Sequence, residues 1–240
     1  MKRYLSTVLF VMLVASGLHA GSLNDFFKQA DSFFSAYVHD GKVAYKEIKA
    51  NSSGIEGLYN TIGIMDLSNA SANEKKAFYI NAYNLIVIYQ VARYYPLKSP
   101  LDQSGFFDRV KHTVAGESIT LNHLEIKNLL FAYKDPRLHF ALACAAQSCP
   151  PLASGAYTPD NVDAKLTDRT TRALNDNNWL VVKTGEGKVE LSKIFDWYKK
   201  DFTMNGQKPV LEFINTYREQ KIPAGYTISY YEYDWSLNEG

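Results

Sequence analysis

The sequence is poor in cysteine, has no excess of charge of either sign, and contains only one long hydrophobic run. It has 2 cysteines in 240 residues, and 26 basic residues stand against 25 acidic ones. A near-neutral chain is not typical of a protein whose main partner is nucleic acid. Glycine-rich phosphate loops and the GxSxG element are also missing from the sequence. These absences disfavour nucleic-acid binding, nucleotide enzymes and serine hydrolases.

The hydrophobic run lies at the start of the chain and has the pattern of a signal peptide. Two basic residues precede an apolar run over residues 4–17, and small Ala20 stands where a cleavage site is expected. The run is shorter than the roughly 20 residues that a spanning helix needs, so a retained anchor is the weaker alternative. The sequence predicts a signal peptide over residues 1–20 and a periplasmic or secreted domain over residues 21–240, with no membrane span after cleavage.

The rest of the chain has the composition and patterning of one packed domain. Apolar residues make up 46% of the sequence, enough for a substantial core. Helical periodicity predicts helices over 22–37, 71–95, 122–133, 192–202 and 209–220, with a further helical stretch inside 156–175. Alternating patterns predict hairpins over 109–121 and 178–195, a buried strand over 137–144 and a closing strand near the C-terminus. The predicted fold class is α+β, with helices packed around a small, mainly antiparallel sheet.

The clearest of these elements is the helix over residues 71–95. Ser71 followed by Glu74 forms a capping-box pattern, and Pro96 ends the periodicity. At about 100° per residue, Glu74 and Asn81 lie only about 20° apart and share the apolar face. Buried amides and carboxylates need hydrogen-bond partners. The two residues therefore either stabilise the fold or orient a catalytic group.

Both cysteines lie in the segment HFALACAAQSCPPL, which begins at His139. In a regular strand His139 faces away from Cys144, whereas Cys149 follows the strand and can turn back toward the ring. A thiolate beside an imidazole is a nucleophile with its general base. One hypothesis is therefore that Cys149 attacks, His139 transfers the proton, and Glu74 or Asn81 orients the ring.

Two further features of this segment bear on cysteine chemistry. Pro150 is favoured at the first position of a helix, so Cys149 is a candidate helix cap, and N–H groups directed at its sulfur would favour the thiolate. In an exported protein, however, two nearby cysteines commonly pair, which makes a disulfide between Cys144 and Cys149 the alternative. The sequence leaves both alternatives open.

No pattern in the sequence points to a cofactor. The remaining histidines of the mature chain do not cluster, and the spacing of His139 and the two cysteines does not match the usual zinc sites. We therefore expect neither a metal nor another cofactor. Four tyrosines near the C-terminus either line a groove for a glycan or peptide or pack on the core. They are Tyr226, Tyr230, Tyr231 and Tyr233.

Five segments, in this order, resemble the family catalogued as domain of unknown function 547. They are EKKAFYINAYN, SITLNHLEIKNLL, DPRLHFALACAAQSCPPL, LSKIFDWYKKDF and YYEYDWSLN, and the third is the most specific. In the second segment the chain departs from the family, because Glu125-Ile126 and Leu129-Leu130 stand where the family tends to have Glu-His and Leu-Arg. The resemblance carries over a set of positions: Glu74, Asn81, Asn84, Glu125, His139, Cys144, Cys149 and Pro150.

The resemblance names a family without a settled activity, although it brings a papain-like cysteine hydrolase into consideration. Two hypotheses for function follow. The first is a cysteine-dependent hydrolase or acyl transferase that acts on a peptide or amide in the cell envelope. The second is a non-catalytic envelope binding or scaffold domain with a Cys144–Cys149 disulfide, whose ligand is a peptide, an amide or a glycan.

Overall fold

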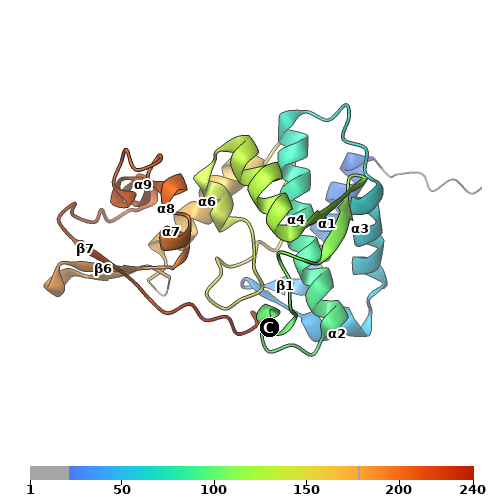
Figure 1. The fold of residues 1–240 in the computed structure, drawn as a ribbon, viewed down its shortest axis with the longest axis horizontal. Helices are drawn as coiled ribbons and strands as arrows, with labels where there is room; N and C mark the ends of the chain where they lie inside the picture. The colour runs from blue at the N-terminus through green and yellow to red at the C-terminus, as the bar shows by residue number, and fades with distance from the viewer. Residues whose placement is uncertain (1–21, 178) are drawn as a thin grey trace, which may run out of the picture.

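The computed structural model describes residues 22–177 and 179–240. The predicted signal peptide lies outside these residues, and its cleavage remains a prediction. Within the described part of the chain, no helix is both long and apolar enough to cross a membrane. Figure 1 shows a cluster of long helices at one end, a smaller lobe of short elements at the other, and a C-terminal tail that runs back from the lobe to the helices.

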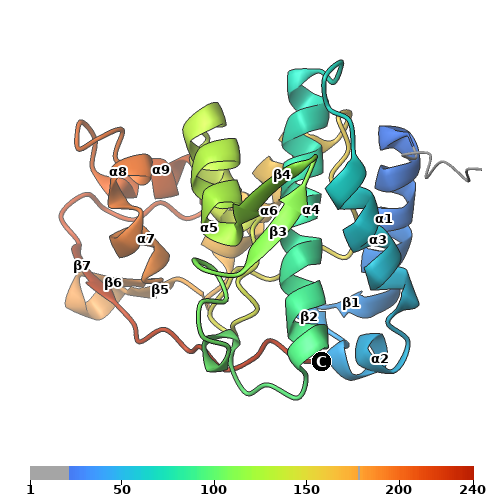
Figure 2. The same ribbon diagram turned by 45° about the vertical axis from the view of Figure 1, so that its right-hand side comes forward.

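The helical end is built around one long, buried helix, α4 (Ala72–Tyr94). Its N-terminus has the predicted capping box, in which Ser71 accepts the N–H of Glu74 and Glu74 accepts the N–H of Ser71. Nearly every residue from Ala77 to Ala92 is buried, because other elements cover the helix on several sides (Figure 2). The helices nearest to the N-terminus are α1 (Leu23–Tyr37), α2 (Tyr45–Ala50) and α3 (Ser53–Ile64).

The strands form three small sheets in the described residues, rather than the single sheet predicted. The first two are antiparallel hairpins, β1 (Val38–His39) with β2 (Lys42–Val43), and β3 (Lys111–Val114) with β4 (Glu117–Thr120). The third has the order β5-β6-β7, formed by β5 (Val181–Lys183), β6 (Lys188–Leu191) and β7 (Thr227–Tyr230). Only β6 and β7 are parallel. The α+β class and the mainly antiparallel pairing are therefore confirmed.

Two local predictions in the middle of the chain are wrong. The helix α5 (Leu121–His123) is capped by Thr120, not by Asn122, and continues as the π-helical stretch η2 (Leu124–Phe131). The segment predicted as a buried strand is instead the 3₁₀ helix η3 (Pro136–Phe140), followed by an irregular turn. Asp135 and Pro136 start this helix, since the Asp135 carboxylate accepts the N–H of Arg137 and proline fits the first position.

The remaining helices follow the predicted pattern. They are α6 (Val162–Asn175), α7 (Ile194–Trp197), α8 (Lys199–Phe202) and α9 (Val210–Tyr217), with single turns η1 (Pro100–Asp102) and η4 (Thr184–Glu186) elsewhere. The predicted 192–202 helix is thus divided at Tyr198. Helix α6 joins two hydrophobic cores: Val162 and Leu166 belong to the core around α4, whereas Ala173 and Leu174 belong to the core of the smaller lobe.

Candidate functional site

A pocket of about 430 Å³ lies where the helical end meets the smaller lobe. Tyr83 of α4 and Glu125 of η2 line it from the helical end, and Trp197 and Tyr198 line it from the smaller lobe. Both cysteines and His139 also line this pocket. The fold therefore brings together His139 and both cysteines, for which the sequence predicted a role in one site.

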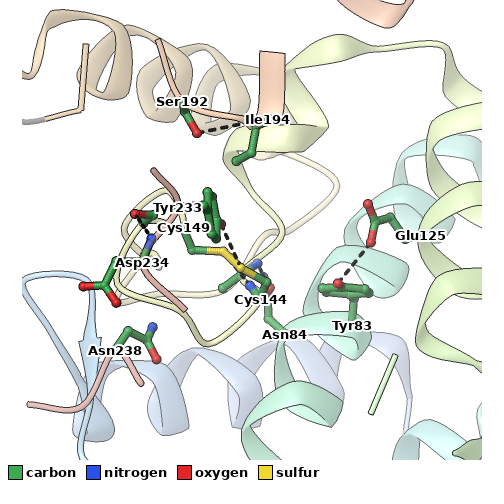
Figure 3. The surroundings of a disulfide bond; sticks show 12 residues. Tyr83, Asn84, Glu125, Cys144, Cys149, Ser192, Ile194, Tyr233, Asp234 and Asn238 are labelled. Carbon is green, nitrogen blue, oxygen red and sulfur yellow. Dashed lines mark hydrogen bonds between the residues drawn. A yellow bond between two sulfur atoms is a disulfide. The ribbon is translucent and has the colours of Figure 1, made fainter. Parts of the chain in front are cut away.

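The two cysteines form a disulfide in the wall of the pocket, with a Cα–Cα distance of 6.1 Å (Figure 3). The described residues include no free cysteine. The N–H of Cys144 lies 2.7 Å from the Sγ of Cys149, and the Sγ of Cys144 lies 3.1 Å from the hydroxyl of Tyr233. Both sulfurs are thus held by polar neighbours inside the pocket wall.

No helix follows Cys149, so its predicted role as a helix cap is wrong. Its own N–H donates to the carbonyl of Ala146, and the chain after Pro150 is irregular. The N–H of Leu152 donates to the carbonyl of Gly41, which ties this segment to the β1–β2 turn. Gly41 has φ +82°, and a Cβ there would lie 2.3 Å from the Cβ of Pro151. The segment after Cys149 is therefore held by close packing against the β1–β2 turn, and it forms no helical turn.

Two buried asparagines of α4 bind the backbone on either side of the disulfide segment, Asn84 before it and Asn81 after it. The side chain of Asn84 donates to the carbonyl of Ala141 and accepts the N–H of Ala143, each at 2.9 Å. Asn81 makes the same pair of contacts with the backbone of Tyr157, at 2.7 and 2.9 Å. These contacts satisfy backbone groups that no strand partner satisfies. Asn81 and Asn84 therefore stabilise the fold.

His139 is held by a residue that the sequence did not indicate. Its Nε2 lies 2.9 Å from Oδ2 of Asp201 on α8, and its buried ring packs against Tyr198 at a centroid distance of 4.2 Å. Glu74 lies in the capping box and Asn81 binds Tyr157, so neither orients His139. Asp201 is 62 residues away in sequence, and only the tertiary fold brings it to the ring.

Glu125 is the second acidic group of the site, and it is buried. Its carboxylate accepts the hydroxyl of Tyr83 at 3.1 Å, shown in Figure 3, and the hydroxyl of Tyr198 at 2.7 Å. Burial, and next the charge of Glu125, raise the pKa of both tyrosines. The hydroxyls therefore stay protonated and donate to the carboxylate at neutral pH. Only the family resemblance pointed to Glu125, because its tyrosine partners are distant along the chain.

Aromatic side chains form the outer part of the pocket. Trp197, Tyr233 and Trp235 contact one another with ring centroids 4.8 to 6.0 Å apart, and Trp197 is 50% exposed. Of the four tyrosines proposed for a groove, Tyr233 lines this pocket. Tyr226 and Tyr230 pack against the core of the smaller lobe, and the N–H of Tyr231 continues the strand pairing to Leu191.

The comparisons with known proteins define the class of this domain. The family described as "Protein of unknown function, DUF547" matches residues 67–172. The chain therefore contains a DUF547 domain over this range, as the resemblance predicted. No curated protein and no solved structure matches the chain. The papain-like architecture stays a prediction.

Proposed function

We propose that the chain is an exported envelope protein that binds a ligand in this pocket, which its DUF547 domain and the C-terminal part of the chain line together. The observation that carries this proposal is the Cys144–Cys149 disulfide in the pocket wall. With both sulfurs bonded to each other, the site offers no thiolate, while its other features suit recognition. The disulfide then holds the pocket wall in place.

The size and lining of the pocket support a binding role. A volume of about 430 Å³ lies within the range of ordinary small-molecule sites, which combine apolar walls with a few fixed polar groups. Here aromatic rings form much of the wall, and Glu125, His139 and Tyr198 are fixed by hydrogen bonds. Peptides, amides and glycans all present an apolar face together with hydrogen-bonding groups, and each is a candidate ligand class.

A second candidate function is the cysteine-dependent hydrolase or acyl transferase, in the reduced state of the protein. Its support is that His139 and both cysteines line one pocket. Since Asp201 occupies Nε2 of His139, Nδ1 would take the proton from the Cys149 thiol. The thiolate would then attack a substrate carbonyl, His139 would return the proton to the leaving amine, and water would release the acyl group.

One experiment separates the two functions. The exported protein is purified without reductant, its free thiols are counted, and hydrolysis of a p-nitrophenyl ester is measured before and after reduction. If the protein only binds a ligand, its two sulfurs should react with an alkylating agent only after reduction, and neither state should hydrolyse the ester. Reduction should also lower the free energy of unfolding by about 2 kcal/mol.

The variants Cys149→Ala and Cys144→Ala, both measured after reduction, are the matched controls. Turnover that appears on reduction, survives Cys144→Ala and is abolished by Cys149→Ala would replace the binding function with the thiol enzyme. Turnover that survives both substitutions would not depend on either sulfur. Export itself is tested by the mass of the protein recovered outside the cytoplasm, which should correspond to a chain that starts at Gly21.

A further inference from the structure

Glu125 is a buried carboxylate whose charge is not balanced by a cation. Only 9% of the residue is exposed, and its two hydrogen-bond partners, Tyr83 and Tyr198, are neutral hydroxyls. Among the described residues, none forms a salt bridge with Glu125. A buried charge is costly unless it is paired. The pocket therefore contains a buried carboxylate to which the described residues supply hydroxyl partners but no cationic one.

The other charged residues of the pocket do not supply that cation. Of the described residues that line the pocket, none is lysine or arginine. Asp108 at the mouth lies 3.9 Å from exposed Arg109, and His139 pairs with Asp201. Each of these other acidic groups thus has a basic side chain nearby, whereas the partners of Glu125 among the described residues are hydroxyl groups alone.

The carboxylate also retains the capacity to bind. A carboxylate offers about four acceptor positions, and the two tyrosine hydroxyls use one on each oxygen. An N–H group of a ligand can take a remaining position. Figure 3 shows Glu125 and Tyr83 on one side of the disulfide and Tyr233 on the other, so a ligand beside the sulfurs would lie between the carboxylate and the aromatic rim.

The aromatic walls of the pocket also favour a cationic group. The faces of tryptophan and tyrosine rings attract cations, most strongly when water is displaced. Trp197, Tyr198, Tyr233 and Trp235 all line the pocket. We infer that the ligand carries an ammonium group on an apolar or aromatic body, with the ammonium directed at Glu125. This inference rests on the proposed binding function.

Three probes of the same size and different charge test this inference. Benzylammonium, benzyl alcohol and benzoate are titrated into the full exported chain by calorimetry. We expect benzylammonium to bind at least about tenfold more tightly than benzyl alcohol, since a hydrogen bond to a charged group adds that much, and benzoate to bind most weakly. Equal or tighter binding of benzyl alcohol or benzoate overturns the inference, as does no binding of benzylammonium up to about 10 mM.

A substitution at the carboxylate, with a matched control, locates the interaction. Glu125→Gln keeps the shape and should weaken benzylammonium at least about tenfold while leaving benzyl alcohol nearly unchanged. Glu117→Gln removes the same charge from an exposed position on β4 and should change neither affinity. If Glu125→Gln does not alter benzylammonium binding, the inference is wrong. If benzyl alcohol still binds in that case, the proposed binding function survives.

A second variant keeps the test decisive if Glu125→Gln fails to fold. Trp197 is half exposed, so Trp197→Ala should fold, and it should weaken benzylammonium about threefold or more beyond its effect on benzyl alcohol. Equal weakening of both probes would overturn the inference. A phenylalanyl-glycine dipeptide and its N-acetylated form then test whether the ammonium of the ligand is a peptide N-terminus. A site for peptide N-termini should bind the free dipeptide more tightly than the acetylated form, and also more tightly than benzylammonium.

Discussion

The two ends of the molecule reach stability in different ways. The helical end is organised by α4, a buried helix of 23 residues, and its core is rich in aliphatic side chains. Apart from α6, which it shares with the helical end, the smaller lobe has no helix longer than the 8 residues of α9 among its described elements. Helices of that length are not stable alone. The lobe depends instead on a cluster of aromatic rings, which includes Phe140, Trp179, Phe195, Phe202 and Phe213.

This difference explains what each end contributes to the pocket. The helical end supplies buried polar groups that are held by hydrogen bonds, such as Glu125 and the backbone bound by Asn84. The smaller lobe and the tail supply the half-exposed ring of Trp197 and the partly buried ring of Trp235. The DUF547 match ends at residue 172, before these rings and before Asp201. The matched part therefore contains Glu125, His139 and both cysteines, whereas the tryptophan rings and Asp201 come from the remainder of the chain.

The strongest test of the comparison is Phe140→Ala, which we expect to cost about 4 kcal/mol of the free energy of unfolding. Phe140 is 1% exposed, and its ring lies 5.4 Å from Trp179 and 6.3 Å from Phe213 between ring centroids. Removal of the ring leaves a cavity at the centre of the smaller lobe. Denaturation by urea measures the loss, and hydrogen exchange should show faster opening of β6 and α9 than of α4.

Phe78→Ala is the matched substitution in the other core, where Phe78 is fully buried against Phe26. It should cost a similar free energy, but its hydrogen-exchange pattern should include α4. If Phe140→Ala accelerates exchange in α4 as much as in β6, the two cores unfold as one unit and the comparison fails.

The next largest effect is expected for Asn84→Ala, at about 3 kcal/mol. The substitution leaves the carbonyl of Ala141 and the N–H of Ala143 without partners in a buried place. Because these groups precede Cys144, the disulfide should also become more rapidly reducible by dithiothreitol. Asn81→Ala is the control: it should destabilise by a similar amount at Tyr157 without changing the reduction rate. Equal reduction rates in the two variants would show that Asn84 does not support the disulfide segment.

These asparagines also show what the sequence can and cannot predict. Helix α4 was predictable because its signals are local, namely the Ser71–Glu74 capping box and the apolar periodicity. The hairpins followed from alternation around their turns. The segment after Pro136 was not predictable, since its alternation of apolar residues fits a strand and only Asn84 shows where its backbone hydrogen bonds go.

The candidate site could be predicted only in part, because only some of its residues are linked by a local sequence pattern. The cysteines and His139 are close in sequence and could be recognised as a group. Asp201 and Tyr198 reach the site from α8 and the residue before it, and no local pattern links them to His139 or Glu125. Their alignment depends on the packing of the aromatic lobe against the helical end, which is a property of the tertiary structure.

The smallest effect is expected for His112 in the helical end, whose titration should change the free energy of unfolding by about 2 kcal/mol between pH 7 and pH 5. Its Nδ1 bonds the hydroxyl of Tyr59 at 3.1 Å, and Nε2 has no partner among the described residues. Burial, and next the charge of Arg93, lower the pKa of His112 to about 4. In the unfolded chain the ring takes up a proton near pH 6.5. Between these two values only the unfolded state is protonated, so stability falls as the pH falls from 7 to 5.

His112→Phe removes this titration while it fills a similar volume. The wild-type chain should lose about 2 kcal/mol more than the variant between pH 7 and pH 5, and little further difference should develop below pH 4. Urea denaturation of both proteins across this range provides the measurement. If the two pH profiles run parallel, His112 is protonated in the folded protein as readily as in the unfolded one. The close packing of the helical end would then not extend to the β3–β4 hairpin.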